Sequence, residues 1–141
     1  MIKTSVRLLQ TLVLGAALCS SALAADSDAL QGKWKADKEF DGQKATFNLE
    51  IKADTFHFEL KGSDGATRFI LKGKVKLEKQ GAFKTMTLHD IKGGDSEANL
   101  NSMEDVRSFV YVTGWKSLTL AGNFDRERDN EEPNLTAYRK E

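Results

Sequence analysis

The sequence is poor in the residues that build disulfides and metal sites, because its 141 residues contain one cysteine and two histidines. A single cysteine cannot form a disulfide within the chain, so packing and backbone hydrogen bonds must stabilise the fold. A tight zinc site needs three or four convergent ligands, whereas His57 and His89 fall on the outward faces of two separate predicted strands. We therefore expect no metal site and no cofactor.

Signatures of catalysis and of nucleic-acid binding are also missing. The 21 basic and 21 acidic residues balance, whereas a nucleic-acid-binding domain usually carries a basic excess. The 11 glycines form no phosphate-binding loop, and no serine lies in a nucleophile-elbow motif. The inward positions of the predicted strands are nearly all apolar, so they supply no pair of carboxylates for glycoside hydrolysis. We expect neither an enzyme nor a nucleic-acid partner.

The only long apolar run lies at the N-terminus. Lys3 and Arg7 precede about 11 largely apolar residues at 8–18, and Ala22-Leu23-Ala24 is the small-x-small pattern that precedes signal cleavage. The run is too short for a transmembrane helix, which needs about 20 residues. We predict a signal peptide at 1–24, cleaved after Ala24, and a secreted or periplasmic protein that does not span the membrane.

Lipidation of the only cysteine is the alternative fate of this segment. Leu18 precedes Cys19, whereas the residue before a lipidated cysteine is normally small, so the sequence favours cleavage after Ala24. Cleavage leaves 117 residues, 25–141, which is the size of one domain. It also lowers the basic count from 21 to 19 against 21 acidic residues, which gives a net charge of −2.

Apolar and polar residues alternate along most of the chain after residue 25. Between Lys44 and Ile51, for example, Phe47 and Leu49 share one face while charged and polar residues occupy the other. This is the pattern of a half-buried strand. The alternation predicts eight strands, the first opening at Gly32 and the others at 44–51, 55–60, 68–77, 84–91, 106–113, 117–122 and 134–140.

Eight sequential strands with short connections favour an antiparallel up-and-down β-barrel, because closure removes the exposed edges. Gly73 interrupts its strand on the inner face, where a glycine permits the sharp bend of a small barrel. Three short connections fall at one end, the floor. The two longest, Lys92–Glu104 and Asn123–Pro133, share the other end, the mouth. The facing of 106–113 stays unassigned, because aromatic residues compete with valines for the inner side.

The chain contains eight phenylalanines, and the predicted alternation directs several of them inward. A barrel of eight strands is just wide enough to be filled by side chains or to hold one small ligand. With so few inward polar groups, a ligand would be lipid-like or aromatic. The inward residues that we predict to contact it are Phe47, Leu49, Phe56, Phe58, Leu60, Phe69, Leu71, Met86 and Leu88.

Both ends of the domain resemble a known superfamily. Leu30-Gln31-Gly32-Lys33-Trp34 opens the first strand, and Tyr138-Arg139-Lys140 ends the last one. In these features the chain resembles the calycins, and more closely small secreted bacterial lipocalin-like domains with no assigned function. The resemblance implies that Trp34 lies at the barrel floor and that Arg139 packs across its ring. Trp115, in a predicted floor turn, is expected to cover the same contact.

Two functions remain open from the sequence. The first is a non-enzymatic barrel that binds a small apolar ligand through the mouth. The second is a barrel with a packed interior that recognises a protein or an envelope component through its mouth loops. In the second case Arg126 and Arg128 are the candidate contacts, because they lie in the charged segment 125–132. That segment lacks the glycine and ligand spacing of a calcium loop.

We expect the mature protein to begin at Ala25, because the basic residues, the short apolar run and the small-x-small site occur in the order of a cleavable leader. Intact-mass measurement of the exported protein tests this. A diacylglycerol-modified Cys19 at the N-terminus would contradict it.

Overall fold

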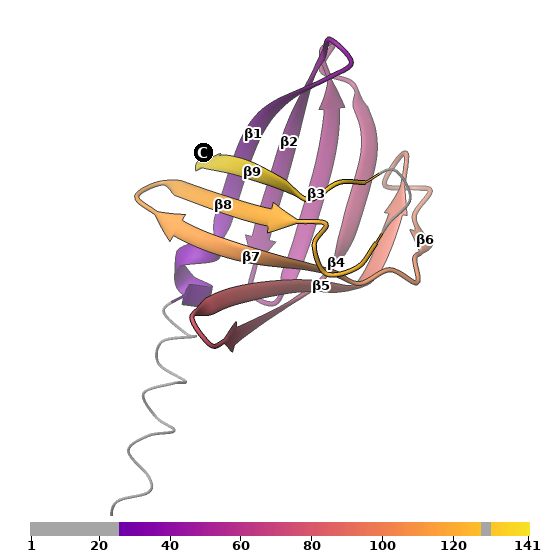
Figure 1. Ribbon diagram of the computed structural model, residues 1–141. Helices are drawn as coiled ribbons and strands as arrows, with labels where there is room; N and C mark the ends of the chain where they lie inside the picture. The colour runs from indigo at the N-terminus through magenta and orange to yellow at the C-terminus, as the bar shows by residue number, and fades with distance from the viewer. Residues whose placement is uncertain (1–25, 128–130) are drawn as a thin grey trace, which may run out of the picture.

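A computed structural model of the protein describes residues 26–127 and 131–141, which form a closed antiparallel β-barrel (Figure 1). Each strand of the barrel pairs with the next along the chain, and the last pairs with the first. The predicted eight-stranded up-and-down fold is therefore confirmed. Its strands are β1 (Gly32–Phe40), β2 (Gln43–Lys52), β3 (Thr55–Gly62), β4 (Thr67–Gln80), β5 (Phe83–Gly94), β7 (Arg107–Gly114), β8 (Ser117–Gly122) and β9 (Asn134–Lys140).

A ninth, very short strand lies inside a loop that the sequence left without a strand. β6 (Asn101–Ser102) pairs only with Lys92 and Gly93 at the end of β5, so β5 is longer than predicted. A short helix at 26–30 is a second unpredicted element. One helical turn is too brief to produce a recognisable hydrophobic period, and a two-residue strand is too brief to show alternation.

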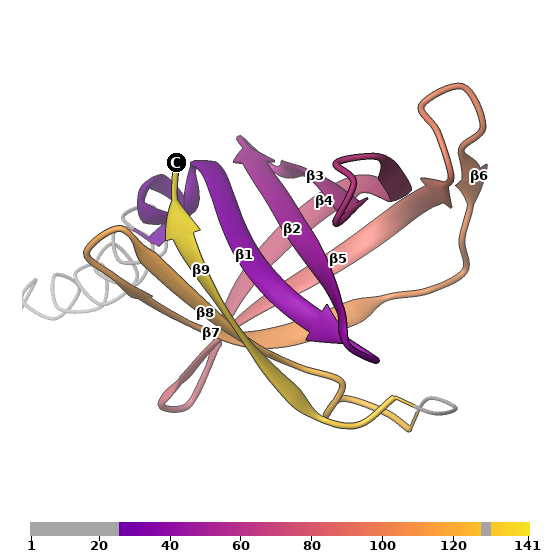
Figure 2. The ribbon, with the colours of Figure 1, turned by 90° about the horizontal axis from the view of Figure 1, so that it is seen from above.

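The two ends of the barrel differ as the connection lengths predict. Figure 2 shows the short N-terminal helix, the β7–β8 turn and the C-terminal end of β9 at one end, and β6 at the other. Leu30, at the end of the helix, is buried, and its carbonyl accepts a 2.8 Å hydrogen bond from Trp34 Nε1. The helix therefore plugs the floor.

The bend at Gly73 has a clear steric cause. The β4–β5 ladder shifts register between Lys72 and Lys74, opposite Asp90, whose φ of 51° is left-handed. A Cβ atom on Gly73 would lie 2.6 Å from the carbonyl oxygen of His89 and 2.8 Å from a ring carbon of Phe56. Only glycine fits this bulge, so the predicted inner-face bend is confirmed.

The fully buried side chains form one hydrophobic core. The mutual packing of apolar groups removed from water is the main favourable contribution to folding. Its members come from all eight barrel strands except β4 and from the N-terminal helix, while Val75, Leu77 and others pack against it as partly buried residues. The buried members are Leu30, Trp34, Ala36, Leu49, Ile51, Phe56, Met86, Leu88, Ile91, Tyr111, Leu118, Leu120 and Tyr138.

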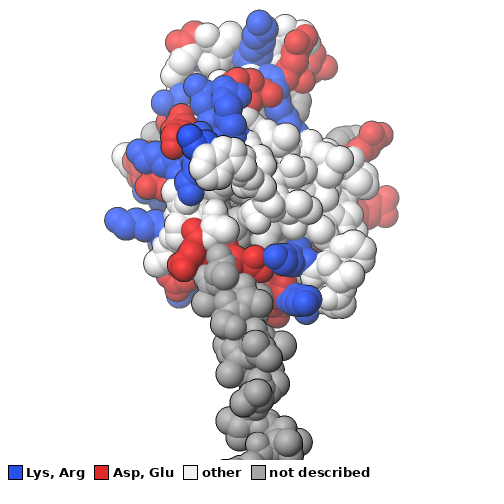
Figure 3. Space-filling view, turned by 90° about the vertical axis from the view of Figure 1, so that its left-hand side faces the viewer, with Lys and Arg blue, Asp and Glu red and all other residues white. Residues whose placement is uncertain are grey.

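The side chains of β7 divide between core and solvent. Tyr111 is buried and Phe109 is partly buried against the core, whereas Val112 is 67 % exposed. The aromatic residues therefore face inward, and the valines join an outer surface without charged residues along most of β7–β9. This surface includes Ala121 and Leu135. Figure 3 shows a broad uncharged area beside a group of lysine and arginine side chains.

The cation over Trp34 is not the one that the resemblance implied. Lys140 Nζ lies 5.2 Å from the Trp34 ring centroid, and the two residues are register partners. Arg139 instead bonds Asp37 Oδ2 on the outside at 2.9 Å. The assignment of Arg139 to the indole is therefore wrong. Side chains alternate along a strand, and because Tyr138 faces the core, Arg139 must face out and Lys140 in.

The expected role of Trp115 is wrong as well. It lies in the β7–β8 turn at the floor end, but its side chain is 89 % exposed, and its nearest cation is the neighbouring Lys116. The N-terminal helix already covers the floor beneath Trp34, so the indole of Trp115 stays in solvent.

Tyr111→Phe should leave the free energy of unfolding unchanged or raise it by about 1 kcal/mol, because the buried Tyr111 hydroxyl has no partner among the described residues. Burial, with a contribution from the charge of Asp26, raises the pKa of Tyr111 from 10.0 to about 12. The stability that this shift contributes is complete below pH 10 and is lost as the pH rises to about 12. Because phenylalanine has no hydroxyl to ionise, the free energy of unfolding of the variant should fall less than that of the wild-type protein over this pH range.

Urea denaturation at neutral and alkaline pH measures both effects of Tyr111→Phe. A loss of more than about 1 kcal/mol at neutral pH would show that the hydroxyl is satisfied after all.

Candidate functional site

The nine residues predicted to contact a ligand all face the barrel interior, but they fall into two groups. Leu49, Phe56, Met86 and Leu88 are buried in the core, where no ligand reaches them without unpacking it. The other five are inward-facing yet only partly buried, so solvent reaches them. These five are Phe47, Phe58, Leu60, Phe69 and Leu71, and we call them the mouth cluster.

The mouth cluster has a defined geometry. The rings of Phe47 and Phe58 meet edge to face, with centroids 5.3 Å apart and planes at 79°. This arrangement is the favoured one for aromatic pairs, because the positive edge of one ring meets the negative face of the other. The cluster comes from β2, β3 and β4, which are joined by long antiparallel ladders. The wall of the interior is therefore rigid on this side.

Met103 lies at the rim of the mouth cluster, a position that no local sequence pattern indicated. Its amide donates a 2.8 Å hydrogen bond to the Ile91 carbonyl, and its side chain is 36 % exposed. A Cβ on Gly93 would lie 2.6 Å from Met103 Sδ and 2.8 Å from a methyl carbon of Leu71. The missing side chain at Gly93 thus gives the flexible thioether room beside Leu71.

A lysine enters the interior beside the aromatic pair, and sequence reasoning missed it. Lys38 has the same strand parity as Trp34 and Ala36, which are buried. Its Nζ lies 5.6 Å from the Phe47 ring centroid. The two-residue spacing from Trp34 and Ala36 indicated that Lys38 faces inward. It was overlooked because nearly all the other inward positions are apolar. Lys38 therefore brings a cation next to the apolar side chains of the mouth.

The loop after β5 is fastened to the outside of the barrel. Glu97 accepts a 3.0 Å hydrogen bond from His57 Nε2 on β3 and also bonds Lys72 on β4. The Lys72 hydrogen bond, followed by that of His57, holds the pKa of Glu97 below its usual value. The loop thus crosses the outer face of β3 and β4, the face toward which the buried Ile70 also points.

The two long mouth loops are linked to each other by ion pairs. Asp105 bonds Arg107 Nε at 2.8 Å and also bonds Arg126, and Arg107 Nη1 lies 3.5 Å from Glu131. Arg126 therefore has an intramolecular role, and reversing its charge would disturb the mouth itself. Arg128, the other arginine predicted to contact a partner, lies outside the described residues.

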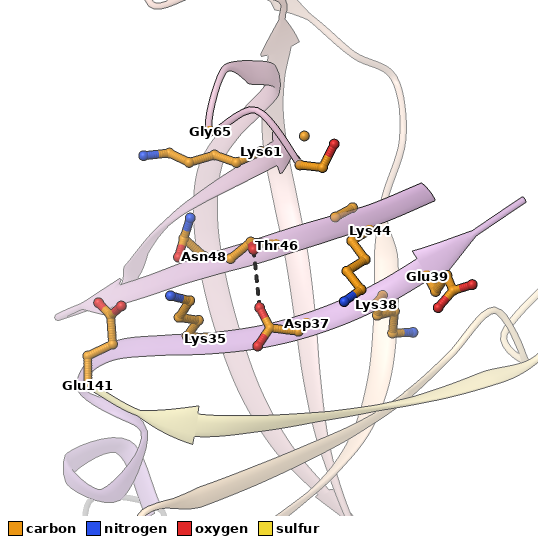
Figure 4. Close-up of a pocket in the computed structure, with 13 residues that line it drawn as sticks. Lys35, Asp37, Lys38, Glu39, Lys44, Thr46, Asn48, Lys61, Gly65 and Glu141 are labelled. Atoms are coloured by element: carbon orange, nitrogen blue, oxygen red, sulfur yellow. Dashed lines mark hydrogen bonds between the residues drawn. The ribbon is translucent and has the colours of Figure 1, made fainter. Parts of the chain in front are cut away.

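A wide concavity lies on the outer face of β1, β2 and β3 (Figure 4). It measures about 760 Å³ and is lined by side chains of both signs, among them Lys35, Lys44 and Glu39. Asp37, at its centre, is bonded to Thr46 and Arg139. A wide polar groove with balanced charges selects no single class of ligand, so the mouth cluster is the better candidate site.

Comparison with known protein families, with curated proteins and with solved structures finds no match to this chain. The part of the chain that the structure describes contains no helix long and apolar enough to cross a membrane. Within residues 26–127 and 131–141, no group of three or more histidine, cysteine or acidic side chains is arranged to hold a metal ion.

Glu97→Gln should loosen the loop at 95–100, because the neutral amide cannot keep both charge-assisted contacts with His57 and Lys72. We expect faster amide hydrogen exchange in that loop and little change in global stability, since both contacts are exposed. The lowered pKa of Glu97 makes the wild-type contact persist at pH 4.5 and fail as the pH falls through that lower pKa.

Glu104→Gln is the matched control for this experiment, because it removes the same charge from an exposed position farther along the same connection. Equal exchange rates in both variants would refute a specific latch at Glu97.

Proposed function

We propose that this protein is an exported, non-catalytic binding protein of the calycin type that takes up a small apolar molecule at the barrel mouth. The observation that carries the proposal is the partial exposure of the mouth cluster. Inward apolar side chains are normally sealed when a barrel is filled by its own residues. Here most inward side chains near the floor are buried, whereas Phe47, Phe58 and Phe69 remain partly exposed above them.

The energetics support a ligand of modest size. Covering about 200 Å² of apolar surface stabilises a complex by about 5 kcal/mol before the costs of association. Five partly exposed apolar side chains, two of them in an edge-to-face aromatic pair, supply surface of that order. The wall formed by β2–β4 is already ordered, so little further entropy is lost when it binds a ligand. We therefore expect weak binding, with a dissociation constant of about 0.1 mM or more, and broad selectivity for shape.

The alternative, recognition of a protein or envelope component through the mouth loops, has weaker support. Its main candidate contact, Arg126, is engaged with Asp105 inside the molecule. The two loops are tied to each other and to the barrel wall, which suits a mouth of fixed shape. The proposed export rests on the N-terminal sequence pattern, and the calycin assignment rests on the barrel together with Trp34 at its floor.

Phe58→Ala should weaken the binding of a neutral apolar dye such as N-phenylnaphthylamine by about fivefold or more, because the ring forms part of the accessible wall. The variant should also lose roughly 3 kcal/mol of stability, the lower end for a large core truncation, since Phe58 is only partly buried. Fluorescence titration well below the melting temperature measures the affinity.

Val112→Ala is the control, because it removes apolar atoms from the outer face of β7. If the wild-type protein binds no neutral dye, or if both variants weaken binding equally, the mouth cluster is not the binding site.

A further inference from the structure

The barrel is closed by a very short seam between its first and last strands. β1 has nine residues and pairs along all of them with β2, but it pairs with β9 only at Trp34–Lys140 and Lys35–Arg139. Beyond Lys35 the two strands diverge toward the mouth, as Figure 2 shows. In the described part of the chain, residues 36–40 of β1 and 134–138 of β9 have no ladder partner across this gap.

Lys38 lies at the inner edge of the seam. Its Nζ reaches toward β9, where the Leu135 carbonyl oxygen is 3.4 Å away, a distance at the outer limit of a hydrogen bond. No carboxylate of the described residues lies within ion-pair distance of it, and the neighbouring Asp37 is bonded to Arg139 on the opposite face. Among the described residues, Lys38 therefore has no counter-ion, and it lies at the junction of an apolar interior and solvent.

The surroundings of Lys38 favour the arrival of an anion. Burial lowers the pKa of Lys38 below its usual value of 10.5. An ammonium that has lost part of its hydration gains more from a carboxylate than one in open water, because the local dielectric constant is lower. The Phe47 ring beneath it supplies a weak cation–π contact and no competing charge.

We propose that the seam between β1 and β9 holds the anionic head group of an amphiphilic ligand, with Lys38 as its counter-ion. The apolar part then lies against Phe47 and Phe58, and the head remains at the side of the barrel between two diverging strands. This inference rests on the proposed function and specifies its ligand class, a single apolar chain or ring bearing one carboxylate, sulfonate or phosphate. A free anion lacks the apolar contacts and should bind far more weakly.

Two dyes with the same aromatic skeleton test the head group directly. Anilinonaphthalene sulfonate carries one negative charge, and N-phenylnaphthylamine carries none. The wild-type protein should bind the sulfonate about tenfold more tightly, the usual effect of one charge-assisted contact. Lys38→Met, which keeps the length of the side chain, should remove this preference and leave the affinity for the neutral dye unchanged.

Two further variants separate the specific contact from net charge. Lys38→Arg should retain the preference for the sulfonate, whereas Lys44→Met, which removes a lysine from the outer groove, should not affect it. In the wild-type protein the preference should fall as the pH rises through the lowered pKa of Lys38. Acetate, an anion without an apolar part, should not displace the dye at comparable concentrations.

The outcomes distinguish this inference from the proposed function. Binding of both dyes with equal affinity, or an equal effect of Lys38→Met on both, would overturn the role of Lys38 while leaving the apolar site intact. If Lys44→Met also removed the preference for the sulfonate dye, the preference would reflect the net charge of the protein, and the specific site at Lys38 would be overturned. If neither dye binds the wild-type protein, the proposed function and this inference fail together.

Discussion

Closure of the sheet into a ring is the constraint on which the rest of the molecule depends. Once β9 pairs with β1 near the floor, every barrel strand has a neighbour on both sides over part of its length, and each strand must send alternate side chains into one shared interior. The barrel closes where Trp34 pairs with Lys140. At this point the lysine ammonium lies over the indole ring, and the Leu30 carbonyl at the end of the helix accepts the indole hydrogen bond. The packing at the floor and the accessible mouth both follow from where that closure is made.

The same closure separates structural from binding roles along individual strands. On β2, Leu49 and Ile51 lie near the floor and are buried, whereas Phe47, nearer the mouth, remains partly exposed. On β3, Phe56 is buried and Phe58 is not. One alternating pattern thus supplies the core at one end and an accessible apolar wall at the other. Whether an inward side chain is buried depends on its distance from the floor, and the alternation of apolar and polar residues carries no information on that distance.

Much of this fold could be predicted from the sequence because the information is local. Alternation defined the strands, and turn residues such as Asp41-Gly42, both with positive φ, separated them. Gly73 marked a bend that only a residue without Cβ can make. Long-range features were less accessible. The assignment of Arg139 to Trp34 was wrong because it depends on the register between β1 and β9, which cannot be predicted from local sequence. Arg139 and Lys140 face opposite sides of the sheet, and the register places Lys140 beside Trp34.

The site was harder to predict than the fold for the same reason. Glu97 meets His57 across 40 positions of sequence, and Arg126 meets Asp105 across 21, so neither pair leaves a local pattern. Lys38 was readable from its parity, but its significance depends on the divergence of β9, which only the assembled barrel reveals.

The seam also has a consequence for how the protein folds. The contact between Asp37 and Arg139 joins residues 102 positions apart, whereas every other barrel ladder joins neighbours along the chain. The entropy of closing so long a loop is lost before its few backbone hydrogen bonds can compensate. We therefore expect a curved sheet to assemble first and the ring to close last. In the native state the seam should reopen most readily, as a local fluctuation far cheaper than global unfolding.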